Sequence, residues 1–134
     1  MKEKTCKQIV EGALRGRIKD IDKLYHADDQ YDEDLGYFNE YGLCFDYVAP
    51  NTFRDQEQAY FRYQLSWGGP SEEFRFFVNP DLSVYQIEFW YLNWFDGACV
   101  VLKGDDYKLM ESIFNDFNDC GSVEYAIKQA QERR

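Results

Sequence analysis

Apolar residues recur every three or four positions near the start of the chain, which is the spacing of one buried stripe on a helix. Val10, Leu14 and Ile18 belong to this stripe, and charged residues occupy the opposite face. Thr5 stands just before the first apolar position and has the side chain of a typical N-cap. The pattern therefore predicts an amphipathic helix over residues 5–25.

The middle of the chain has a different pattern, with period two and a high content of aromatic residues. Residues 60–95 hold all three tryptophans and are divided by turn signals at 68–71 and 79–81. In the first of the three resulting segments, apolar and polar residues alternate as in a half-buried strand. Together with an apolar segment at 43–49, this predicts an antiparallel meander sheet of about four strands.

Two more amphipathic helices are expected after the sheet. The segment of residues 98–102 is short and apolar, and it could form either an extra strand or the approach to a helix. Asp105 or Asp106 would cap a helix that ends near Gly121, and Ser122 would cap a last short one. A helix followed by strands and then by helices is typical of the α+β class, so we expect residues 1–134 to form a single α+β domain.

Charge changes the picture most, because the net charge of −10 is concentrated in one part of the chain. Residues 28–57 carry nine acidic residues and one basic residue, whereas residues 1–27 are net positive. Nucleic acids and anionic membranes bind basic surfaces, so neither is an expected direct partner. The segment is compatible with a different partner, namely the basic surface of a protein that itself binds nucleic acid. A solvated acidic loop that only keeps the chain soluble is the alternative.

The sequence carries no catalytic or metal-binding signature, and we expect no cofactor and no metal. The acidic run does not fit the calcium loop of an EF-hand in either register tested, and the four cysteines are not spaced as zinc ligands. The N-terminal residues lack the apolar segment of a signal peptide, so we expect a cytoplasmic protein with free thiols. The oligomeric state is expected to be monomer or dimer.

The candidate partner-binding residues are acidic side chains and tryptophans in segments without a helical stripe. The carboxylates would imitate the phosphate line of DNA, and an exposed tryptophan would anchor the complex. The residues selected are Asp28, Asp29, Asp32, Glu33, Asp34, Glu40, Trp67, Glu72, Glu73 and Trp94.

The phrases QLSWGGPSEEFRF and NWFDGA lie within residues 40–98, and this stretch resembles small uncharacterised acidic proteins of phages and conjugative elements. No established activity comes with that resemblance. Small acidic proteins of mobile elements are often antirestriction or anti-CRISPR factors, and this chain is similar to them in size and charge. The resemblance implies a non-enzymatic inhibitor of a host defence complex that acts as a local DNA mimic. The alternative is a small enzyme or an accessory subunit with an unrecognised site.

Overall fold

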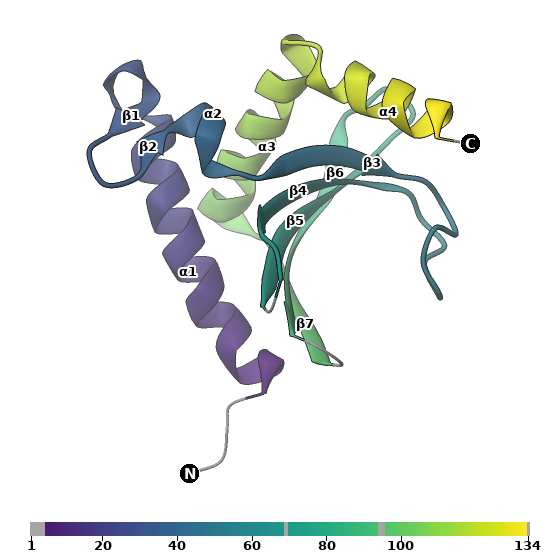
Figure 1. The fold of residues 1–134 in the computed structure, drawn as a ribbon, viewed down its shortest axis with the longest axis horizontal. Coiled ribbons are helices and arrows are strands. Elements are labelled where there is room, and N and C mark those ends of the chain that lie inside the picture. The colour runs from purple at the N-terminus through teal and green to yellow at the C-terminus, as the bar shows by residue number, and fades with distance from the viewer. Residues whose placement is uncertain (1–4, 69, 94–95, 134) are drawn as a thin grey trace.

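A curved five-stranded antiparallel sheet forms the centre of the fold in this computed structural model, which describes residues 5–68, 70–93 and 96–133 (Figure 1). Each strand pairs with the next one along the chain. The antiparallel meander is therefore confirmed, but the sheet has five strands rather than four. The strands are β3 (Cys44–Val48), β4 (Tyr60–Ser66), β5 (Ser71–Val78), β6 (Val84–Asn93) and β7 (Asp96–Val101).

The fifth strand, β7, comes from a segment for which the sequence left two interpretations open. Its Ala98 and Val100 face the core, whereas Cys99 and Val101 are exposed, so the segment has the alternation of an edge strand. The residues Trp-Phe-Asp-Gly at 94–97 also predict a turn, but residues 96 and 97 already belong to β7 and pair with β6. Residues 94 and 95 lie outside the described residues.

Three helices cover one face of the sheet: α1 (Cys6–Tyr25), α3 (Gly104–Asp119) and α4 (Ser122–Glu132) (Figure 1). Thr5 caps α1 through a capping box with Gln8, as its position predicts. The expected caps of α3 and α4 are wrong by one to three positions, because these helices begin earlier along the chain. Lys103 is the N-cap of α3 and Gly121, with φ of 89°, is that of α4.

Residues 26–42 form a small unit beyond the end of α1, and its Phe38 is buried in the main core. It contains a 3-10 turn η1 (Asp28–Gln30), a two-residue strand β1 (Tyr31–Asp32), its partner β2 (Gly36–Tyr37) and a single helical turn α2 (Phe38–Tyr41). The two strands form a sheet of their own, which the sequence pattern does not predict.

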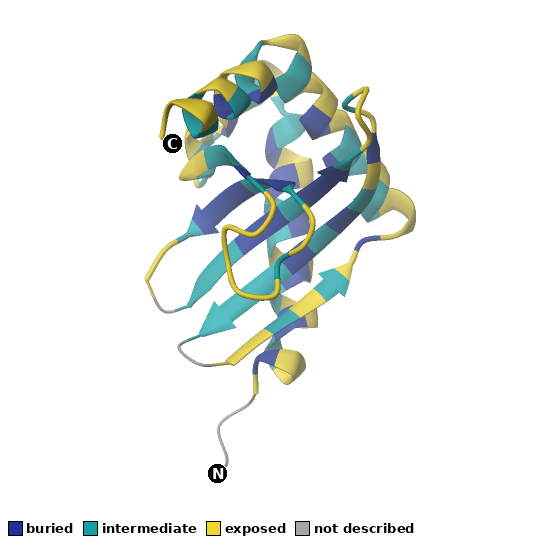
Figure 2. Ribbon diagram, turned by 90° about the vertical axis from the view of Figure 1, so that its right-hand side faces the viewer, coloured by how far each residue is buried: buried dark blue, intermediate teal, exposed yellow. Residues whose placement is uncertain are grey.

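The main core lies between the helices and the sheet. Phe114 of α3 is fully buried, with its ring centroid 5.4 Å from that of Phe61 on β4 and 5.1 Å from that of Phe76 on β5. Apolar residues of β6 and α1 complete the same cluster. Figure 2 shows the buried positions running in bands across the strands. The alternation that predicts half-buried strands therefore arises because one face of the sheet packs against helices.

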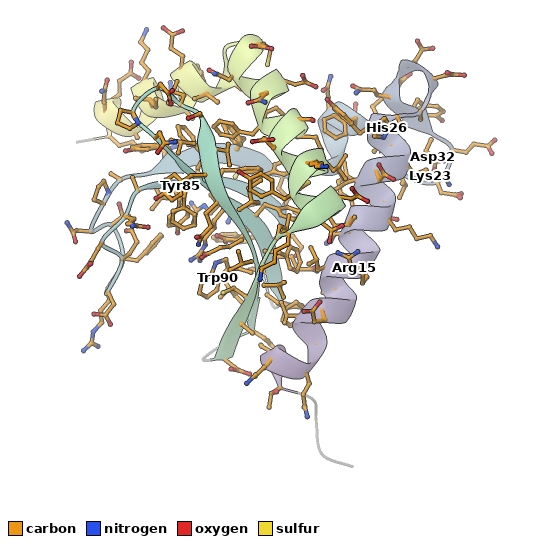
Figure 3. All side chains as sticks on the ribbon, turned by 180° about the vertical axis from the view of Figure 1, so that it is seen from behind. Arg15, Lys23, His26, Asp32, Tyr85 and Trp90 are labelled. Atoms are coloured by element: carbon orange, nitrogen blue, oxygen red, sulfur yellow. The ribbon has the colours of Figure 1, made fainter. Side chains whose placement is uncertain are left out.

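The opposite face of the sheet, which we call the open face, carries no helix in the described part of the chain. The loop of residues 49–59, between β3 and β4, crosses part of it (Figure 2). Val48, Tyr60 and Phe77 form a second, smaller buried cluster there. Tyr85 and Trp90 of β6 project from this side of the sheet, away from the helices (Figure 3).

Candidate functional site

The acidic segment folds into a β1–β2 hairpin that is organised around Asp32. One carboxylate oxygen of Asp32 accepts hydrogen bonds from the backbone N–H groups of Asp34 and Leu35, at 3.0 and 3.1 Å. The other lies 3.1 Å from the Lys23 ammonium group on α1 (Figure 3). Only 14% of the Asp32 side chain is exposed. Asp32 therefore shapes the turn and holds it against α1, and this carboxylate is not presented to a partner.

Asp32 gives rise to a pH effect confined to the hairpin. The Lys23 hydrogen bond, assisted by the two backbone N–H groups, lowers the pKa of Asp32. A carboxylate with a lowered folded-state pKa adds stability above its unfolded pKa of about 3.9, and that stability is lost as the pH falls through the folded pKa. We expect Asp32→Asn to speed amide hydrogen exchange at residues 34 and 35 near neutral pH. The difference from the wild type should disappear below the folded pKa.

Amide exchange followed by NMR at several pH values checks this expectation, with Asp34→Asn as the matched control. The Asp34 side chain is exposed and makes no hydrogen bond to a described residue, so its exchange profile should follow that of the wild type. Equal exchange of Asp32→Asn and wild type at neutral pH would show that the turn does not depend on this carboxylate.

The remaining carboxylates of the hairpin region point into solvent. Asp28, Asp29, Glu33 and Asp34 are exposed, and none forms an ion pair with a described residue. We call these four residues the acidic end. Glu40, on the adjoining α2, is exposed as well. The structure thus brings together six of the ten residues selected from the sequence, and all of them except Asp32 are exposed.

Two helix C-termini add to the negative potential at the acidic end. Helix α1 ends at Tyr25 and α3 ends at Asp119, and the Tyr25 hydroxyl donates a hydrogen bond to Asp116 that joins the two ends. Burial, followed by this hydrogen bond, raises the pKa of Tyr25 to about 12, so it remains a donor at neutral pH. Unpaired carbonyl groups give a helix C-terminus a partial negative charge. The last turn of α3 contains no basic residue, and Lys23 in α1 is bound to Asp32.

An exposed pair of tyrosines is flanked along the chain by these carboxylates, and the sequence pattern did not predict it. Tyr31 and Tyr37 lie opposite each other on β1 and β2, with ring centroids 4.8 Å apart, and they are 45% and 51% exposed. Large aromatic side chains left in solvent are common anchors of protein interfaces. The local signal was present: residues 31–37 read Tyr-Asp-Glu-Asp-Leu-Gly-Tyr, and Gly36 takes a φ of 82° in the turn.

The other selected residues lie elsewhere in the fold. Glu72 receives two hydrogen bonds from Arg17, which is two turns, or roughly 12 Å, before the end of α1. Glu73 is 3% exposed and pairs with Arg75. Trp67 is 73% exposed at the end of β4, and Trp94 lies outside the described residues. The β4–β5 region therefore does not extend the acidic end.

The open face holds a second candidate site, a groove of about 520 Å³ between the sheet and the loop of residues 49–59. Its lining includes Phe53, Tyr60, Arg75, Phe77, Glu88 and Trp90, and the loop adds residues 54–58, three of which are charged. The volume is within the range of small-molecule sites, about 300–1,000 Å³. None of these six residues stands out in the sequence, because only the strand register and the path of the loop bring them together.

Gln56 gives the loop over the groove a defined shape. Its side-chain oxygen accepts from the backbone N–H groups of Thr52 and Phe53, and its amide nitrogen donates to the carbonyl groups of Ala49 and Gln58. All of the hydrogen-bonding groups of this side chain are therefore used within the loop. The groove is a preformed feature, with the sheet on one side and a braced loop on the other.

The described residues contain no cluster of three or more His, Cys, Asp or Glu side chains that could hold a metal ion. No described helix combines the length and apolar character needed to cross a bilayer. All four cysteines are unpaired; Cys6 is buried and the other three are exposed.

Comparison with known proteins returned no relationship: no family model, no curated protein and no solved structure matches the chain. The function must therefore be argued from the two sites described above.

Proposed function

We propose that this protein is a non-enzymatic binding protein whose acidic end docks on the basic surface of a nucleic-acid-binding protein. The observation that carries this proposal is the exposed pair of Tyr31 and Tyr37, surrounded by four carboxylates without ionic partners in the described part of the chain. By occupying that surface, the protein inhibits its target in competition with nucleic acid. A restriction or CRISPR complex that defends a host against phages and other mobile elements is the proposed type of target.

The density of charge at the acidic end is what suits such a partner. Each strand of the hairpin has two residues and so extends only about 7 Å. Four carboxylates on and beside it approach the spacing of a few phosphates on DNA, where one charge falls on each ~1.7 Å of axis. Because the first helix is rich in basic residues, the mimicry is local and does not extend over the whole surface.

The carboxylates and the tyrosines contribute to different steps of binding. Exposed charges act at long range, so they raise the association rate and make it depend on salt. The tyrosine rings act only in contact, so they set the lifetime of the complex. Both groups stand on one hairpin that Asp32 holds against α1, so the whole contact surface is preorganised.

The test is capture of partners from host lysate, followed by binding kinetics of a neutralised variant. Replacing Asp28, Asp29, Glu33 and Asp34 by Asn or Gln should slow association roughly tenfold or more at low salt and remove most of its salt dependence. Stability should stay within about 0.5 kcal/mol per substitution, since all four side chains are exposed. Duplex DNA should compete with the wild type for the captured protein.

The matched control neutralises four exposed carboxylates that lie outside the acidic end: Glu11, Asp55, Asp105 and Glu124. This variant changes the net charge by the same amount, so a general charge effect would slow both variants equally. Equal association rates of the two variants, or a captured partner that DNA does not displace, would contradict the proposal.

A further inference from the structure

Two opposite charges stand side by side in the groove of the open face without pairing. Arg75 on β5 and Glu88 on β6 are directly opposite each other in the strand register, and both line the groove. Opposite charges in this position usually attract each other across the strands. Here each side chain is held by neighbours on its own strand, and the two do not form an ion pair.

Arg75 is fixed so that one edge of its guanidinium group remains available. Its Nε donates to the buried Glu73 at 2.8 Å, and its planar group lies 4.8 Å from the ring centroid of Tyr60 and 4.1 Å from that of Trp90. Neither Nη atom donates a hydrogen bond to a described residue. Such an immobilised edge can bind a carboxylate through two parallel hydrogen bonds.

Glu88 is fixed in a complementary way. Its two carboxylate oxygens accept hydrogen bonds from the side-chain amide of Gln86 at 2.8 Å and from the indole N–H of Trp90 at 2.9 Å. Both donors are neutral, and no cation among the described residues pairs with this carboxylate. Each oxygen retains a second lone pair, so a charged donor can still bind there.

We propose that the groove binds a small zwitterion with an aromatic or large apolar body, a class that includes α-amino acids. The carboxylate of the ligand pairs with the Nη edge of Arg75, and its ammonium group pairs with Glu88. The body of the ligand lies against Phe53, Tyr60 and Phe77, which supply the apolar wall. A ligand that is neutral overall also avoids repulsion by the acidic protein.

This site is separate from the acidic end, and neither proposal depends on the other. The groove is lined by residues of β4, β5, β6 and the loop of residues 49–59. The acidic end instead follows the C-terminus of α1 (Figure 1).

The experiment uses three ligands of one size: phenylalanine, phenethylamine, which lacks the carboxylate, and 3-phenylpropanoate, which lacks the ammonium group. Binding is followed through the NMR signal of the Trp90 indole N–H, identified by its loss in Trp90→Phe. That proton is hydrogen-bonded to the Glu88 carboxylate, so a ligand bound at Glu88 changes its chemical shift. We expect phenylalanine to bind at least about tenfold more tightly than either truncated ligand, since each loses a charge-assisted interaction.

Glu88→Gln tests the pairing of Glu88 with the ligand's ammonium group by changing the protein instead of the ligand. The amide keeps the shape of the side chain but removes its charge, so binding of phenylalanine should weaken about tenfold or more while 3-phenylpropanoate is unaffected or improved. Glu124→Gln on α4, far from the groove, is the matched control and should bind like the wild type. Phenethylamine binding as tightly as phenylalanine, or no shift with any of the three ligands, would overturn the proposal.

Discussion

Phe114→Ala should lower the free energy of unfolding by about 3–5 kcal/mol, the usual cost of removing a phenylalanine ring from a core. The side chain of Phe114 is fully buried, and its ring contacts those of Phe45, Phe61 and Phe76. These partners come from three different strands, so no single neighbour can move to fill the space. Urea unfolding followed by far-UV circular dichroism measures the loss.

Tyr125→Ala is the control for that measurement. Tyr125 is an aromatic residue of α4 and is 64% exposed, so its removal should change the free energy of unfolding by less than about 0.5 kcal/mol. A loss below about 1 kcal/mol for Phe114→Ala would mean that α3 does not pack on the sheet as described.

Arg75→Leu should destabilise the fold to a similar extent, by about 3–5 kcal/mol, because it leaves the carboxylate of Glu73 buried without its cationic partner. The side chain of Glu73 is 4% exposed and its ion pair with Arg75 is 2.8 Å long. The substitution also removes the cation–π contacts with Tyr60 and Trp90.

The double variant Glu73→Leu/Arg75→Leu separates the effect of the unpaired Glu73 carboxylate from the effect of the lost cation–π contacts. Replacing both members of a buried ion pair by apolar residues is often close to neutral, so most of the lost stability should return. Equilibrium unfolding of the two single variants, the double variant and the wild type gives the coupling energy. A double variant as unstable as Arg75→Leu would show that the stacking of the guanidinium group, and not the ion pair, holds this part of the sheet.

Local patterns were sufficient for most of the fold. The apolar stripe of α1 and its N-cap at Thr5 depend only on residues of that helix, and the alternation in β4 depends only on residues of that strand. The strand missed in the count, β7, has only two of its six residues facing the core, so its alternation is weak. The β1–β2 hairpin has too few residues to produce a periodic signal at all.

The candidate sites were harder to predict because the role of each side chain depends on residues that are distant in the sequence. Nothing near Asp32 or Glu72 in the sequence shows that Lys23 and Arg17 engage them. The groove requires the register between β5 and β6, which contains a bulge after Phe77 that spacing alone does not reveal. Charge counts identified the acidic end correctly as a dense local feature, but they could not separate the exposed carboxylates from the one that shapes the turn.

The order of the strands has a consequence for how the chain folds. The five strands form successive hairpins between neighbours in sequence, and such local contacts favour rapid folding. Two helices are exceptions: α4 packs on β3, and α1 packs on β6 and β7. The backbone N–H of Cys6 in α1 donates to Asp96 at a separation of 90 residues. During synthesis, α1 leaves the ribosome before the strands on which it packs, and it docks only after β7 has emerged. Its apolar stripe stays uncovered over that interval, which leaves this helix open to chaperones and to aggregation.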